Sequence, residues 1–221
     1  MSHTEKMIDQ KDLPPQEGMS QSLALPAMLV LWLGAVLLGM SVIWEYQVTP
    51  GELPDAPKDW PADSRMTCNH RRPTLVMFAH PRCPCTRASI GELALIMAHG
   101  PERIDARVLF YKPASFLEGW EKTDLWETAK HIPGVSVSSD IDGSEAHLFG
   151  ATTSGYVLLY DANGQLLFHG GITGSRGHSG DNVGRTAIET ILTGGNTERQ
   201  TTFTFGCPLL GRNDACQQEN Q

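Results

Sequence analysis

Short apolar runs alternate with helical spacings along the middle of the chain. The run 75–78 is apolar throughout, as in a buried strand, and residues 88–98 carry large apolar side chains at the spacing of one helix face. The same criteria predict five strands, at 74–78, 106–111, around Val135, 156–160 and 165–169. They predict helical segments at 88–98, 120–131, 145–149 and 181–192. This order is typical of an α/β domain.

The last two expected strands are separated by Asp161-Ala-Asn-Gly164. Asn-Gly between two apolar runs is a strong signal for a hairpin, which makes its two strands antiparallel. Strands joined through helices are parallel instead. We therefore expect a central mixed sheet flanked by helices.

An uninterrupted apolar run occupies residues 23–43 and contains no charged residue. A helix of this length crosses a hydrocarbon layer of about 30 Å at about 1.5 Å per residue. A cleaved secretion signal is the alternative, but a long segment precedes the run and no small-x-small site follows it, which favours an uncleaved transmembrane helix. Lys6 and Lys11 precede the run and only Lys58 follows within comparable reach, so the remainder of the chain is expected outside the cytoplasm.

The remaining segments are polar or rich in proline. Residues 1–22 are expected to form a disordered tail, and 44–71, with four prolines between 50 and 61, an extended linker. The α/β domain is expected over 72–195 and a polar C-terminal tail over 196–221. That tail carries Cys207 and Cys216, for which a local disulfide is favoured over a role of Cys207 as a resolving thiol. Cys68 is then free or paired with one of them.

The composition narrows the choice of partners. The net charge of −8 and the absence of a basic block argue against nucleic acid. Five cysteines are an odd number, so at least one thiol has no intramolecular disulfide partner. The glycine-rich segment 170–182 lacks the lysine of a phosphate-binding loop and is interpreted as a loop beside the cysteines, which presents Arg176. We expect no cofactor.

Cys83 and Cys85 lie between the first expected strand and the first helix. The first turn of a helix presents unpaired N–H groups that stabilise a thiolate, and Arg82 and Arg87 add positive charge. A disulfide between residues only one apart closes a small, strained ring that is easily reduced. The pair is therefore suited to thiol-disulfide exchange rather than to a structural staple.

Three stretches, 78–86, 146–155 and 156–164, resemble the thioredoxin superfamily, and especially its membrane-anchored thiol-disulfide proteins of the bacterial periplasm. The resemblance covers residues 72–195 and implies a thioredoxin-like fold. It also implies that Cys83, at an exposed loop mouth, attacks a partner protein's disulfide and that Cys85 resolves the mixed disulfide. The protein would sit in the bacterial inner membrane with this domain in the periplasm.

The chain departs from the family pattern at two positions. The second cysteine comes one residue early, so the motif is Cys-Pro-Cys and Thr86 occupies the usual position; Gly155 stands at the position of the family's cis-proline. Two other functions therefore stay open. A copper-binding assembly factor would use both thiolates with His80 or His147, because soft Cu(I) prefers such ligands. A thiol peroxidase would need only Cys83.

Overall fold

The computed structural model describes residues 21–100, 103–195, 197 and 199–209. The chain divides into two compact units, Met1–Glu45 and Tyr46–Gln221, and each is described by itself. The tail expected over 1–22 lies almost wholly outside the described residues.

The first unit consists, as far as it is described, of most of helix α1, Gln21–Val48. Its stretch Ala24–Val48 is long and apolar enough to cross a membrane by length and composition, a test that a secretion signal near an N-terminus also passes. The expected span 23–43 lies inside this helix. The helix ends just before Thr49, whose α conformation is disfavoured because Pro50 follows it.

The second unit is built on a five-stranded sheet in the order β3-β2-β1-β4-β5. Its strands are β1 Thr74–Ala79, β2 Asp105–Lys112, β3 Val135–Ile141, β4 Tyr156–Tyr160 and β5 Leu166–Gly171. The first three strands are mutually parallel, and β4 is antiparallel to both β1 and β5. The expected mixed sheet is confirmed, and so is the hairpin at Asn163-Gly164, where Gly164 has a φ of +80°.

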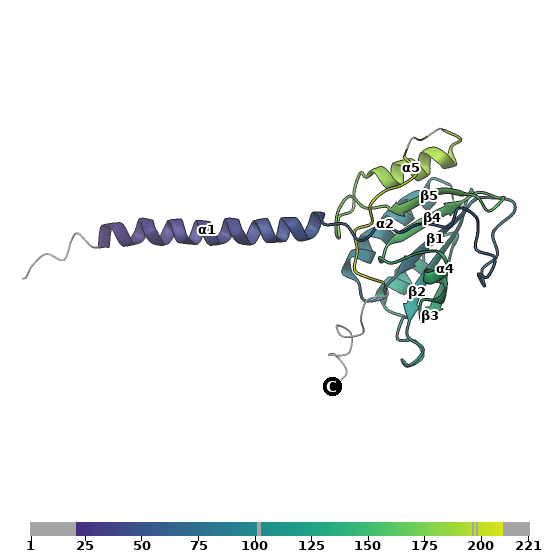
Figure 1. Ribbon diagram of the computed structural model, residues 1–221, viewed down its shortest axis with the longest axis horizontal. Helices are drawn as coiled ribbons and strands as arrows, with labels where there is room; N and C mark the ends of the chain where they lie inside the picture. The colour runs from purple at the N-terminus through teal and green to yellow at the C-terminus, as the bar shows by residue number, and fades with distance from the viewer. Residues whose placement is uncertain (1–20, 101–102, 196, 198, 210–221) are drawn as a thin grey trace, which may run out of the picture. The chain divides into compact units, whose positions relative to one another are not determined.

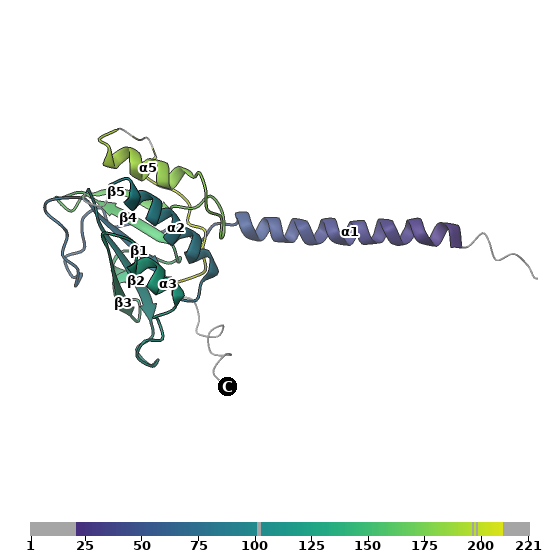
Figure 2. The ribbon, with the colours of Figure 1, turned by 180° about the vertical axis from the view of Figure 1, so that it is seen from behind.

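Helices cover both faces of the sheet. On one face lie α2 Pro84–Ala98, α3 Asp124–Lys130 and α5 Val183–Leu192, and on the other lies the short helix α4 Ser144–Leu148. Figure 1 shows α4, and Figure 2, seen from behind, shows α2 and α3. Alternate side chains of β1 enter the two cores: Met77 packs with α2, whereas Phe78 packs with Phe149. The fold is the expected thioredoxin-like α/β fold.

Segments on either side of 72–195 also belong to this second unit. Trp60, from the expected linker, packs edge to face on Phe149 and Tyr160, at centroid distances of 5.1 and 5.2 Å. In the expected C-terminal tail, Leu209 is 2% exposed and belongs to the same apolar cluster. Isolated apolar residues in polar segments produce no periodic pattern, so the sequence alone does not assign these segments to the core.

Candidate functional site

Cys83 and Cys85 lie at the start of α2. Cys83 is the N-cap residue, with φ −84° and ψ 116°, and its carbonyl accepts a hydrogen bond from the Thr86 N–H at 3.1 Å. Pro84 occupies the first helical turn, where its missing N–H costs nothing. Cys85 follows in that turn. The strand-to-helix junction predicted for this pair is therefore the one observed.

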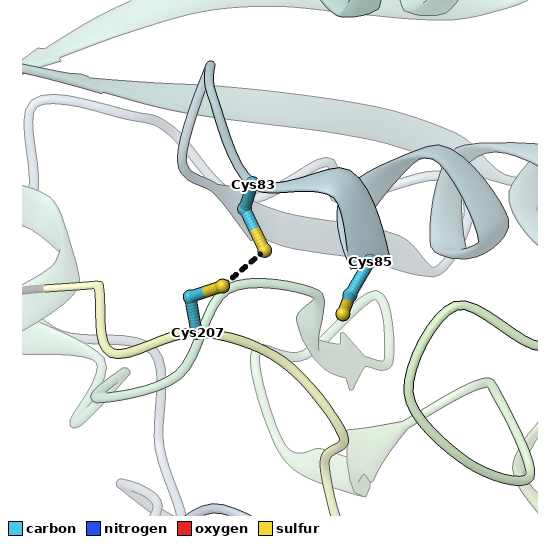
Figure 3. A group of neighbouring side chains, drawn as sticks. All are labelled: Cys83, Cys85 and Cys207. Carbon is cyan, nitrogen blue, oxygen red and sulfur yellow. Dashed lines mark hydrogen bonds between the residues drawn. The ribbon is translucent and has the colours of Figure 1, made fainter. Parts of the chain in front are cut away.

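Cys83 is not at an exposed loop mouth: its residue is 2% exposed, and Cys85 is 7% exposed. A third cysteine explains part of this burial. The sulfur of Cys207 lies 2.9 Å from that of Cys83, and the three sulfur atoms of Cys83, Cys85 and Cys207 lie within 4.8 Å of one another. Figure 3 shows the three side chains converging, two from α2 and one from the C-terminal segment. All three are free thiols, because a disulfide bond is much shorter, about 2.05 Å.

The backbone of residues 207–209 holds Cys207 in this place. The Ser154 N–H donates to the Cys207 carbonyl at 2.9 Å, and the Leu209 N–H donates to the Thr152 carbonyl at 2.7 Å. These bonds flank an antiparallel bridge between Thr153 and Pro208. The C-terminal segment therefore pairs, as a short strand would, with the segment that precedes β4.

The segment 152–154 is itself fixed to the centre of the domain. The Ser154 hydroxyl accepts from the His80 N–H at 2.8 Å and lies 2.6 Å from the Thr86 hydroxyl of α2. The next N–H, of Gly155, donates to the Phe78 carbonyl at 2.7 Å. Gly155, at the position of the family's cis-proline, has a φ of +89°, and no cis peptide bond occurs among the described residues. Cys207 thus docks on a rigid edge.

Of the three thiols, Cys83 carries the negative charge. Donation from the Cys207 thiol holds the pKa of Cys83 well below its usual value, and hydrogen bonds from Thr86 act in the same direction, although burial opposes them. The pKa of Cys207 is raised, first because its proton is held by Cys83. Burial, followed by the negative charge of Cys83, raises the pKa of Cys85. The cluster therefore pairs one thiolate with two protonated thiols near neutral pH.

The arginines expected to activate Cys83 have other contacts. Arg87 forms an exposed ion pair with Asp124, and the Arg82 guanidinium lies over the Trp120 ring, 5.1 Å from its centroid. Arg176, from the glycine-rich loop, lies near the other two cysteines: its positive charge opposes the rise in the pKa values of Cys85 and Cys207, and it donates to the Gly206 carbonyl. The loop does lie beside the cysteines.

Neither histidine named as a copper ligand joins the three sulfurs. His80 is half-buried, with its ring stacked on Tyr111 at a centroid distance of 6.0 Å, and burial lowers its pKa. His147 is exposed on α4. Within the described part of the chain, the group of ligand atoms close enough to share a metal ion is made of the three cysteine sulfurs.

The two other cysteines do not contribute to this site in the described structure. The sulfur of Cys68 lies 3.9 Å from the Thr74 hydroxyl and 3.5 Å from the Asp161 carbonyl, at the opposite end of β1 from Cys83. Cys216 lies outside the described residues, and with it the expected pair of Cys207 and Cys216. In the described structure, the Cys207 sulfur is in contact with the Cys83 sulfur. The sequence offered a signal for this position, since Phe205 and Leu209 flank Cys207 with apolar side chains.

The sequence matches no protein-family model and no curated protein. Solved structures do match. A hypothetical protein from Sinorhizobium meliloti 1021 is 21% identical, over 76% of this chain and 93% of that one, with a TM-score of 0.52. An uncharacterized conserved protein from Geobacillus kaustophilus is 16% identical, over 75% of this chain and 94% of that one, also with a TM-score of 0.52.

More distant matches include a secreted disulfide oxidoreductase of Mycobacterium tuberculosis, which is 12% identical over 57% of this chain and 83% of that one, with a TM-score of 0.41. At such identities a structural match concerns the fold alone. The strand order β3-β2-β1-β4-β5, with β4 antiparallel to β1 and β5 and a helix capped by Cys83 directly after β1, is that of a thioredoxin-like fold.

Proposed function

We propose that this chain is a membrane-anchored protein that carries out thiol-disulfide exchange on partner proteins outside the cytoplasm. The observation that carries the proposal is the sulfur pair at the start of α2, in which the Cys83 sulfur lies 2.9 Å from the Cys207 sulfur and the hydrogen bond between them lowers the pKa of Cys83. A thiolate is the nucleophile of disulfide exchange, and an adjacent thiol completes the reaction.

In the proposed reaction the Cys83 sulfur attacks one sulfur of a partner's disulfide. A mixed disulfide forms, and the partner's other sulfur leaves as a thiolate. A second thiol of the domain then attacks the Cys83 sulfur, which gives an intramolecular disulfide and a fully reduced partner. Another dithiol protein reduces the domain again, and the opposite direction of electron flow uses the same steps in reverse.

The proposed location rests on α1 and on the charges around it. Ala24–Val48 has the length and composition of a membrane span, and the lysines that precede it favour a cytoplasmic N-terminus. The domain then lies in the periplasm of a bacterium, where disulfide chemistry persists. A reporter fused after Gln221 should be active outside the cytoplasm, and the protein should remain in membranes after alkaline extraction. Recovery of a shortened, soluble protein would instead identify α1 as a cleaved signal.

Exchange is tested with glutathione disulfide as the probe. Reduced protein should react and acquire a disulfide, which mass spectrometry detects, whereas Cys83→Ser should be unreactive because the thiolate is absent. Cys68→Ser is the matched control and should react like the wild type, since Cys68 lies at the other end of β1. Full reactivity of Cys83→Ser would refute the proposal.

One observation favours a second candidate, a Cu(I)-binding assembly factor: three sulfurs within 4.8 Å form a soft ligand set. Titration of the reduced protein with Cu(I) against a competing chelator separates the two functions. Tight binding of one equivalent, lost in Cys83→Ser, together with no reaction of the wild type with glutathione disulfide, would support the copper function.

A further inference from the structure

We propose that Cys207, rather than Cys85, is the thiol that resolves the mixed disulfide on Cys83. This inference rests on the proposed function and assigns its second catalytic residue. It also gives the C-terminal segment 206–209 a role, as an internal strand that delivers this thiol to the start of α2.

The positions of the two candidate thiols favour Cys207. Its sulfur lies 2.9 Å from that of Cys83, in direct contact, whereas Cys85 is two residues further along the same chain. The Cys85 sulfur also lies within 4.8 Å of that of Cys83, but only one residue separates the two cysteines, so a bond between them would close a small, strained ring. Cys207 approaches from a separate segment and can bond to Cys83 without such a ring (Figure 3).

The docking of the segment is built into the domain and does not depend on the sulfurs alone. Leu209 is 2% exposed in the apolar cluster of α4, and the two backbone hydrogen bonds to Thr152 and Ser154 set the register. Gly206 lies so close to the backbone of Ser154 that a Cβ atom added at Gly206 would be 2.0 Å from the Ser154 carbonyl oxygen. Arg176 donates to the Gly206 carbonyl. These contacts bring Cys207 back to Cys83 each time the segment docks.

The contact between the two sulfurs changes when a partner is bound. While Cys83 is ionised, its hydrogen bond with Cys207 raises the pKa of Cys207. Once Cys83 is bonded to a partner its sulfur is neutral, so this cause disappears; burial still raises the pKa of Cys207, and the positive charge of Arg176 opposes that rise. The Cys207 thiolate then attacks the Cys83 sulfur, the Cys83–partner bond breaks, and the partner's sulfur leaves with the electron pair and takes up a proton.

The test compares Cys207→Ser with Cys85→Ser in reaction with glutathione disulfide. Serine at 207 keeps a hydroxyl that can still donate to Cys83 but cannot form a disulfide. We expect the glutathione adduct on Cys83 to persist at least about tenfold longer in Cys207→Ser than in the wild type, because an adjacent thiol reacts as an intramolecular group. Cys85→Ser should pass to an intramolecular disulfide like the wild type.

A second measurement uses the unaltered protein and so does not depend on the folding of a variant. Peptide mapping of wild type oxidised by glutathione disulfide should recover Cys83 joined to Cys207. Recovery of Cys83 joined to Cys85, or rapid loss of the adduct in Cys207→Ser, would overturn this inference while leaving exchange intact. Absence of any adduct on Cys83 would refute the proposed function itself.

Discussion

The start of α2 and the C-terminal segment 206–209 contribute to the same cluster of sulfurs but are held there by different means. Cys83 and Cys85 are positioned by their own helix, through a cap hydrogen bond from Thr86 and the turn that contains Pro84. Cys207 is positioned by pairing with residues some fifty places earlier in the chain, by one apolar anchor and by a guanidinium group.

This difference separates a permanent part of the site from a part that can be released. Removing the start of α2 would disrupt a helix and a central strand, whereas undocking 206–209 breaks two backbone hydrogen bonds and exposes Leu209. Because Cys83 is buried beside this segment, we expect a partner's disulfide to reach it more easily when the segment is undocked. The predictions below change one of the two parts and leave the other intact.

The largest effect is expected from Leu209→Asp. A carboxylate in the apolar cluster would be costly, so the segment should undock and the buried Cys83 should become exposed. At about pH 9, where a free thiol is largely ionised, we expect Cys83 to react with iodoacetamide at least about tenfold faster than in the wild type. Leu117→Asp is the matched control, because Leu117 is 87% exposed. Equal rates in all three proteins would show that the segment does not shield Cys83.

A smaller effect is expected from Gly206→Ala. The added methyl group would meet the Ser154 carbonyl oxygen, so the backbone must shift, and overpacking of this kind costs about 1–3 kcal/mol. Urea denaturation measures the free energy of unfolding. Gly174→Ala is the control, since a Cβ atom at Gly174 meets nothing within 4 Å and should leave stability unchanged. The same loss in both variants would contradict close packing at Gly206.

The next effect concerns the pH dependence of Cys83 alkylation. Donation from Cys207 stabilises the thiolate and lowers the pKa of Cys83, so the wild type should react with a midpoint below the ordinary value of about 8.5. Cys207→Ala removes the donor, the pKa of Cys83 rises, and the midpoint should move to higher pH. A midpoint that stays in place would mean that the helix terminus alone activates Cys83.

The smallest effect is expected from Thr86→Val, which removes a weaker donor. Hydrogen bonds from Thr86 also lower the pKa of Cys83, but its hydroxyl is shared with Ser154 at 2.6 Å. The alkylation midpoint should therefore move in the same direction as in Cys207→Ala, and by less. A larger shift than in Cys207→Ala would reverse the assigned order of the two donors.

Local patterns were sufficient to predict most of the sheet. The apolar run at β1 and the Asn-Gly turn before β5 depend only on neighbouring residues, and so does the placement of Cys83 between a strand and a helix. The sequence also places Cys85 beside Cys83, and their sulfurs lie within 4.8 Å of each other. Residue types alone could not decide which of the thiols lies in contact with Cys83.

The apolar neighbours of Cys207 suggested that it could fold back, but its place beside Cys83 could not be decided from the sequence because its docking uses backbone groups. The hydrogen bonds to Thr152 and Ser154 involve N–H and C=O groups that almost any residue has, so they leave no periodic pattern in the sequence. Proline lacks the N–H, yet Pro208 fits because its position in the pairing requires none. The packing of Trp60 leaves no sequence signal for a related reason, since one partly buried aromatic residue among prolines resembles part of a linker.

The contact between Cys83 and Cys207 also determines what an oxidant does to this protein. Peroxide converts a thiolate first to a sulfenic acid, and further oxidation to a sulfinic acid is irreversible for most proteins. A thiol 2.9 Å away can condense with the sulfenic acid, release water and form a disulfide that dithiols reduce again. We therefore expect the C-terminal segment to give an oxidised Cys83 a route back to the reduced state.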